Sequence, residues 1–76
     1  MSKVFDYSKL LGRIKEKKFT QVSLAGDIGM SETSLNHKLA NKSPFKQSEM
    51  LMVCEALEIP IDNIGEYFFR PKLKKT

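Results

Sequence analysis

The 76-residue sequence has one cysteine, one histidine and no tryptophan, and it lacks any apolar run long enough to cross a membrane. One cysteine cannot form an internal disulfide, and with one histidine it cannot supply the ligands of a structural zinc site. A spanning helix needs about 20 mostly apolar residues, and the N-terminus also lacks the apolar run of a signal peptide. We therefore expect a cytoplasmic protein with no cofactor and no membrane contact.

Recognisable catalytic groups are also missing. No set of residues with triad or metal-ligand spacing accompanies His37 or Cys54, and so short a chain leaves little room for a substrate pocket. Cys54 lies on an apolar helical stripe, which favours an inert core thiol over a reactive nucleophile. The sequence thus indicates that the protein is not an enzyme and has no small-molecule substrate.

Positive charge is in excess, with 13 Lys and Arg against 9 Asp and Glu and a formal net charge of +4. A basic chain favours an anionic partner, although charge alone is a weak argument. The length fits a single domain over 1–76, near the lower size at which a chain folds without disulfides or metal. We expect an all-α fold, a compact bundle of about five short helices, with a basic C-terminal arm over about 69–76.

The centre of the sequence predicts two short helices joined by a tight turn. Thr20 can cap a first helix over 21–28 and Ser31 a second over about 32–40, because each hydroxyl can accept a bond from a free amide of the opening turn. Gly29 suits the left-handed position that ends the first helix. So short a connection requires a steep crossing, which is the geometry of a helix-turn-helix.

Three further helices are expected around this pair. Apolar residues at helical spacing predict one over about 6–17, with Asp6 opening it. The same periodicity predicts another over about 47–57, with Leu51 on its apolar inner side. A last short helix is expected over about 62–67.

The outward face of the second helix of the pair carries side chains that suit base recognition. If this helix lies in a DNA major groove, its first turn and outer face meet the base edges. Asn can bond adenine twice, Glu can accept from cytosine, and a Thr methyl can pack against thymine. The residues predicted to contact bases are Glu32, Thr33, Ser34, Asn36 and His37. Two alternatives stay open: an acid favoured by the helix dipole at Glu32, and an exposed imidazole without function at His37.

Polar and basic side chains at the edges of the pair suit the DNA backbone, because phosphate contacts fix the register of a protein on a duplex. The predicted phosphate contacts are Thr20, Gln21, Lys38, Asn41, Lys42, Ser43 and Lys46. Gln21 opens the first helix, where its side chain and the backbone amides can point at one phosphate. The loop over 41–46 can also be a plain surface connection. Lys15, Lys17 and Lys18 can be either phosphate contacts or ordinary solvated surface.

The C-terminal segment changes from aromatic to basic, with three consecutive aromatic residues over 67–69. Three exceed what one small core needs, so part of the segment is expected to pack against a second copy of the chain. The predicted dimer residues are Tyr67, Phe68, Phe69 and Leu73. The alternative is that Phe68 closes the core and residues 72–76 fray in solvent.

The stretch TQVSLAGDIGMSETSLNHKLANK resembles the helix-turn-helix of the lambda-repressor-like, or XRE, family. The matching residues are Gln21, Leu24, Ala25, Gly29 and Ser31. The downstream CEALEIPIDNI is similar to the fourth-to-fifth-helix segment of that family, so the resemblance covers about 7–68. The whole chain looks most like small Cro-type regulators of temperate phages.

This resemblance implies a five-helix fold that binds operator DNA, usually as a dimer. It further implies that Gln21 touches phosphate and that Glu32, Thr33 and His37 face bases. The leading hypothesis is therefore a sequence-specific transcriptional regulator of phage or prophage origin, which represses by occupying a palindromic operator on the nucleoid of a bacterial host. Its partners would be double-stranded operator DNA and a second copy of the chain.

A protein-interaction module is the alternative hypothesis, for example an antitoxin-like or anti-repressor subunit. Such a module would use the exposed segment over 67–73 to hold its partner. The fold does not separate the two hypotheses, because one fold can carry several functions.

Overall fold

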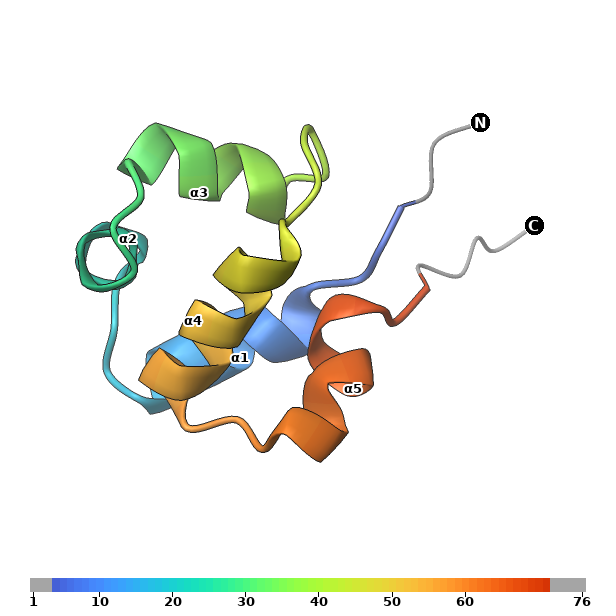
Figure 1. Ribbon diagram of the computed structural model, residues 1–76. Coiled ribbons are helices and arrows are strands. Elements are labelled where there is room, and N and C mark those ends of the chain that lie inside the picture. The colour runs from blue at the N-terminus through green and yellow to red at the C-terminus, as the bar shows by residue number, and fades with distance from the viewer. Residues whose placement is uncertain (1–3, 72–76) are drawn as a thin grey trace.

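The computed structural model describes residues 4–71, and this part of the chain folds into a bundle of five short α-helices and one 3₁₀ turn (Figure 1). The elements are α1 (Ser8–Glu16), α2 (Gln21–Asp27), α3 (Glu32–Leu39), α4 (Gln47–Leu57), η1 (Ile61–Asn63) and α5 (Ile64–Phe68). The predicted all-α fold is confirmed. Among the described residues, no helix is both long enough and apolar enough to cross a bilayer.

The two predicted caps of the central helices are present. The Thr20 hydroxyl accepts from the Ser23 amide at 3.1 Å, and the Ser23 hydroxyl accepts from the Thr20 amide at 2.9 Å, so α2 opens with a reciprocal capping box. The Ser31 hydroxyl accepts from the Ser34 amide at 3.1 Å and caps α3. Both helices therefore begin where their local sequence predicts.

Helices α1 to α4 all end in one backbone motif. A residue just past each end lies in the left-handed region: the second residue after α1, α2 and α3, with φ of 64° at Lys18, 70° at Gly29 and 64° at Asn41, and the first after α4, with φ of 55° at Glu58. The next amide then bonds back to the last turn, as the Met30 amide does to the Ala25 carbonyl at 2.8 Å. Gly29 adopts this conformation without steric cost and asparagine tolerates it, whereas it costs residues such as Lys18 and Glu58 about 1–2 kcal/mol.

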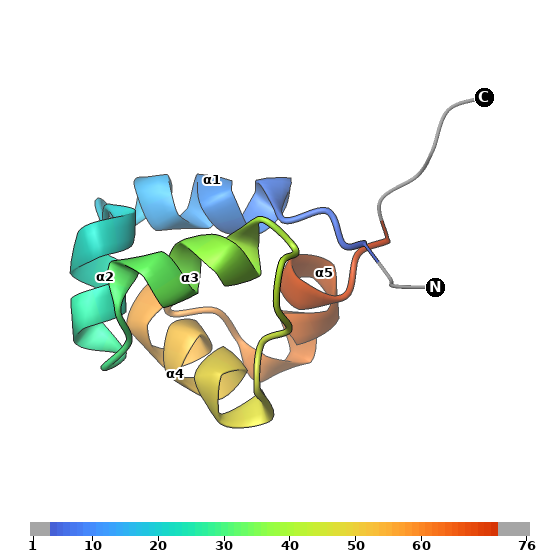
Figure 2. The ribbon, with the colours of Figure 1, turned by 90° about the horizontal axis from the view of Figure 1, so that it is seen from above.

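The N-terminal boundary of α1 differs from the prediction. Phe5 and Asp6 precede the helix as a separate segment, because the Asp6 amide donates to the Arg70 carbonyl at 2.8 Å and Phe5 forms an antiparallel bridge with Pro71. The Asp6 side chain accepts from the Ser8 amide at 2.9 Å, two residues before the helix begins. The segments before α1 and after α5 consequently lie side by side (Figures 1 and 2).

The core lies where the five helices meet. Each helix contributes fully buried side chains, and the largest of these are Phe68, Leu10, Leu24, Leu35, Leu57 and Val53. Cys54 is 4% exposed, and burial raises the pKa of its thiol, which agrees with an inert core residue. The prediction for Leu51 was wrong. Its side chain is 49% exposed, because α4 turns that position away from the other helices.

Candidate binding surface

Helices α2 and α3 form the pair that the sequence predicts. In Figure 1, α2 is seen end-on while α3 lies across the page, so the two helices cross at a steep angle. Ala25 and Leu35 are buried at 2% and 1% exposure, which fixes the inner sides of the pair. The opposite side of α3 is exposed.

Four of the five predicted base-contact residues lie together. Glu32, Thr33, Asn36 and His37 are all exposed and line one shallow hollow of about 210 Å³ on α3. They meet because positions three and four apart share one helix face. Ser34 is exposed but lies outside the lining of the hollow. The structure therefore offers a polar surface with one carboxylate and one imidazole.

A hydrogen bond joins this surface to the start of α2. The Asn36 side-chain amide donates to the Gln21 side-chain oxygen at 3.0 Å. Asn36, a predicted base contact, is thus bonded to Gln21, a predicted phosphate contact, and the bond restricts the rotation of both side chains. The bond orders the seam between the two helices before any partner arrives.

The single lysine of α3 is engaged within the molecule. The Lys38 ammonium lies 3.4 Å from a Glu49 carboxylate oxygen and donates to the Pro44 carbonyl at 3.2 Å. The Lys38 side chain is only 12% exposed, so it is much less available to a phosphate than predicted. A loop separates the two partners in sequence, which is why no local spacing predicts this ion pair.

The other predicted phosphate contacts fall into two groups. The Asn41 side chain clamps the backbone of Phe5, because its oxygen accepts from the Phe5 amide and its nitrogen donates to the Phe5 carbonyl, both at 3.0 Å. The Thr20 hydroxyl serves the cap of α2. Lys42 and Lys46, by contrast, are exposed on the α3–α4 loop, and Ser43 between them is half-buried.

The aromatic residues predicted to form a dimer interface have different surroundings. Phe68 is 1% exposed and packs edge-on against Phe45 at a centroid distance of 5.1 Å, so its assignment to an interface between copies is corrected. Tyr67 is half-buried beneath the Lys9 ammonium, which lies 5.2 Å from the ring centroid. Phe69 is 48% exposed. The fourth predicted residue, Leu73, lies outside the described residues.

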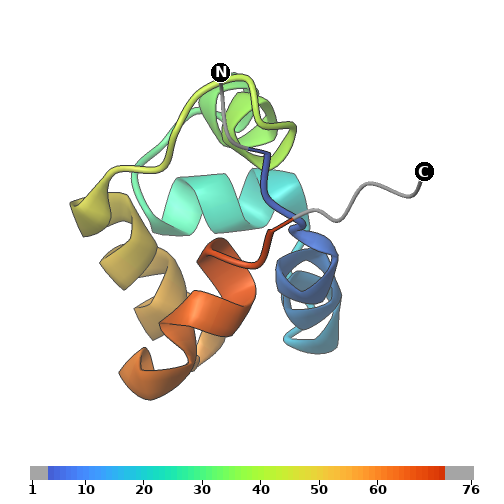
Figure 3. The same ribbon diagram turned by 90° about the vertical axis from the view of Figure 1, so that its right-hand side faces the viewer.

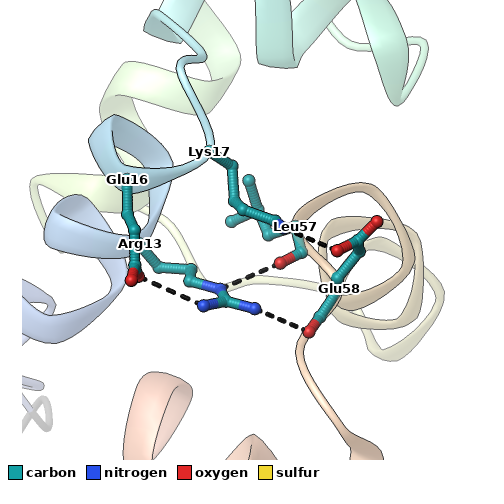
Figure 4. Close-up of polar contacts among 5 residues, drawn as sticks. All are labelled: Arg13, Glu16, Lys17, Leu57 and Glu58. Atoms are coloured by element: carbon teal, nitrogen blue, oxygen red, sulfur yellow. Dashed lines mark hydrogen bonds and ion pairs between the residues drawn. The ribbon is translucent and has the colours of Figure 1, made fainter.

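Between α1 and the end of α4, two basic side chains make contacts within the fold. The Arg13 guanidinium donates to the Leu57 carbonyl at 2.9 Å and to the Glu58 carbonyl at 2.8 Å, and it pairs with Glu16 at 3.1 Å (Figure 4). The Lys17 ammonium lies 2.5 Å from the Glu58 carboxylate. Lys17 lowers the pKa of Glu58 through this hydrogen bond and its charge. Lys17 is therefore a structural residue here.

The helix pair has little positive charge of its own. Within α2 and α3, Asp27 and Glu32 are exposed, while the only lysine or arginine is the engaged Lys38. A chain with a net charge of +4 thus presents a helix pair without a free lysine or arginine. This charge distribution is uncommon for a DNA-binding element, since phosphate neutralisation supplies much of the affinity for DNA.

Comparison with known proteins agrees with this fold. The family described as "Protein of unknown function (DUF739)" matches residues 2–71. The chain belongs to the DUF739 family. None of the proteins with curated annotation matches it.

This DUF739 protein is similar to a phage protein of known structure. It is similar to the modulator of repression (MOR) of the temperate bacteriophage TP901-1 from Lactococcus lactis, known from a solution structure. The two are 40% identical, with a TM-score of 0.76, over 92% of this chain and 95% of the other. The predicted link to regulators of temperate phages is supported at this level, whereas membership of the lambda-repressor-like family stays a prediction.

Proposed function

We propose that this DUF739 protein regulates repression in a temperate phage or prophage by binding another protein of the repression system, most simply the repressor. The observation that carries the proposal is the 40% identity, along nearly the whole chain, to a phage modulator of repression. A modulator acts on repression that another protein establishes. A protein partner is therefore the direct interpretation of that relationship.

The charge on α2 and α3 supports a protein partner. The exposed carboxylates of Asp27 and Glu32 repel phosphate, and Lys38 is tied to Glu49. The same surface is complementary to a basic protein face, because opposite potentials favour encounter and like charges exclude wrong partners.

A reporter assay separates this proposal from direct operator binding. A promoter with the operator of the phage that encodes the protein drives the reporter, with or without the repressor gene. Co-expression of the DUF739 protein is expected to change reporter output only when the repressor is present. An equal change without the repressor would contradict the proposal, and light scattering on the mixed purified proteins should show a complex.

Direct operator binding is the second candidate function, and one observation favours it. Glu32, Thr33, Asn36 and His37 line one hollow, and Asn36 is bonded to Gln21 at the start of α2. In this function a dimer would place two copies of α3 about 34 Å apart in successive major grooves.

Selection of duplexes from a random pool tests this second function, at about 150 mM salt, where binding by charge alone is weak. Enrichment of a two-fold symmetric sequence would establish it. Recovery of unrelated sequences would leave α3 without a role in base recognition.

A further inference from the structure

An apolar groove lies away from the exposed side of α3. Its volume is about 420 Å³, and it opens between the α3–α4 loop, the extended segment before α1 and the end of α5. Figure 3 looks onto this side of the molecule. Five of its ten lining residues are aromatic, and these are Phe5, Tyr7, Phe45, Phe68 and Phe69. The size falls within the range of about 300–1,000 Å³ typical of ligand pockets.

The walls of the groove are held in place before anything binds. Tyr7 packs edge-on against Phe45 at 5.6 Å, and Phe5 packs edge-on against Phe69 at 5.9 Å between ring centroids. The Asn41 amide fixes the backbone of Phe5 from the loop side. A preformed groove binds more tightly than a flexible one, because less conformational entropy is lost on binding.

Within the described part of the chain, two residues that line the groove remain accessible to a binding partner. Phe69 keeps 48% of its surface exposed although it borders an apolar cavity. Lys42 is the only charged lining residue, and its ammonium makes no ion pair or hydrogen bond within residues 4–71. An apolar groove bordered by the Lys42 ammonium fits an apolar side chain with a carboxylate beside it.

We infer that this groove binds an acidic peptide segment of a partner protein, with a large apolar side chain among the rings and a carboxylate against Lys42. A second copy of the chain fits poorly. A two-fold interface repeats the same surface on both sides, so it would bring the Lys42 ammonium of one copy towards that of the other. The inference rests on the proposed function only in that the partner is a protein.

Nucleic acid also fits less well than peptide. Base stacking needs exposed ring faces, whereas Phe45 and Phe68 are 7% and 1% exposed and present edges to neighbouring rings. The groove therefore accepts a side chain more readily than a base.

Peptide selection against the full-length protein tests the inference. Random dodecapeptides displayed on a carrier are selected at about 150 mM salt, which screens distant charges but not close pairs. The expected consensus joins one or two Leu, Ile, Phe or Met residues to Asp or Glu. A consensus without acidic residues, the absence of any consensus, or displacement of the peptides by random single-stranded DNA would overturn the inference.

Matched variants assign the selected peptide to the groove. Lys42→Glu is expected to weaken binding about tenfold, since a charge reversal replaces an attraction with a repulsion. Lys15→Glu makes the same change on the exposed side of α1 and should leave affinity unchanged. Phe69→Ala should weaken binding, while Leu51→Ala, at a position of matched 49% exposure, should not. Equal behaviour of either variant and its control would overturn the assignment.

The reporter assay and the peptide assay can reject the two hypotheses independently. If the protein alters repression but Lys42→Glu behaves like Lys15→Glu in both assays, the groove inference fails and the proposed function stands. If acidic peptides bind the groove but the DUF739 protein changes reporter output equally with and without the repressor, the proposed function fails and the docking site stands.

Discussion

Two basic regions of the molecule use their charges differently. At the contact between α1 and α4, Arg13 and Lys17 bind the end of α4 (Figure 4). On the α3–α4 loop, Lys42 and Lys46 are exposed, and neither ammonium has a partner within residues 4–71. The difference follows from the acceptors nearby: the left-handed end of α4 presents two carbonyls and a carboxylate, whereas the loop presents none to these lysines.

The comparison shows why total charge is a poor guide to function. The net charge of +4 includes cations that close the fold and cations that are free to meet a partner. Only the second kind can recruit an anionic ligand. Substitutions in the two regions should therefore have opposite consequences, with stability lost in the first and binding lost in the second.

The largest effect on stability should come from the buried aromatic residue of α5 that packs against the α3–α4 loop. Phe68→Ala is expected to lower the free energy of unfolding by about 3–5 kcal/mol, because it leaves a cavity beside Phe45. Urea denaturation measures this loss, and Phe69→Ala, at a half-exposed site, is the control with a much smaller loss. A loss that vanished at low protein concentration would instead indicate that Phe68 stabilises a dimer.

The contrast between the two basic regions predicts the next effect. Arg13→Ala should cost about 2–3 kcal/mol, since two carbonyls at the end of α4 lose a charged donor. Lys42→Ala should change stability by less than about 0.5 kcal/mol, as exposed substitutions usually do. Urea midpoints of the two variants give the comparison. Similar losses for both would mean that the loop lysine is also structural.

A smaller effect should follow at the clamp between the loop and the N-terminal segment. Asn41→Gly keeps the left-handed backbone but removes both hydrogen bonds to Phe5, at an expected cost of about 1–2 kcal/mol. Amide hydrogen exchange should speed up at Phe5 and not at Leu24 in the core. Unchanged protection at Phe5 would show that the bridge to Pro71 holds this segment without the clamp.

The sequence predicts the local features of this fold and misses the long-range ones. Thr20, Ser31 and Gly29 are identified because a cap or a left-handed turn depends on residues only a few positions apart. The hydrogen bonds between Asn41 and Phe5 join residues 36 positions apart, and no periodicity in the sequence predicts them. The two residues become neighbours only after the helices pack.

The candidate surface follows the same division. Helical spacing alone brings Glu32, Thr33, Asn36 and His37 to one face, and the structure agrees. Spacing cannot tell that Lys38 is held by Glu49 or that Phe68 is buried, because both depend on which side of the bundle the neighbouring helix covers. A helix pattern therefore identifies an exposed face more reliably than it identifies the free charges around that face.

The smallest expected effect is a pH dependence at the contact between α1 and α4. Lys17 holds the pKa of Glu58 below its ordinary value, so Glu58 stabilises the fold above the unfolded-state pKa of about 4.3, and this contribution is lost as pH falls through the lowered folded-state value. Lys17→Met removes the partner. The melting temperature of this variant, followed by circular dichroism from about pH 6 to about pH 3, should fall less steeply than that of the wild type. Lys15→Met, on the exposed side of α1, is the control and should keep the wild-type slope. Equal slopes for Lys17→Met and the wild type would mean that the ion pair has no part in acid stability, and that Arg13 alone secures the end of α4.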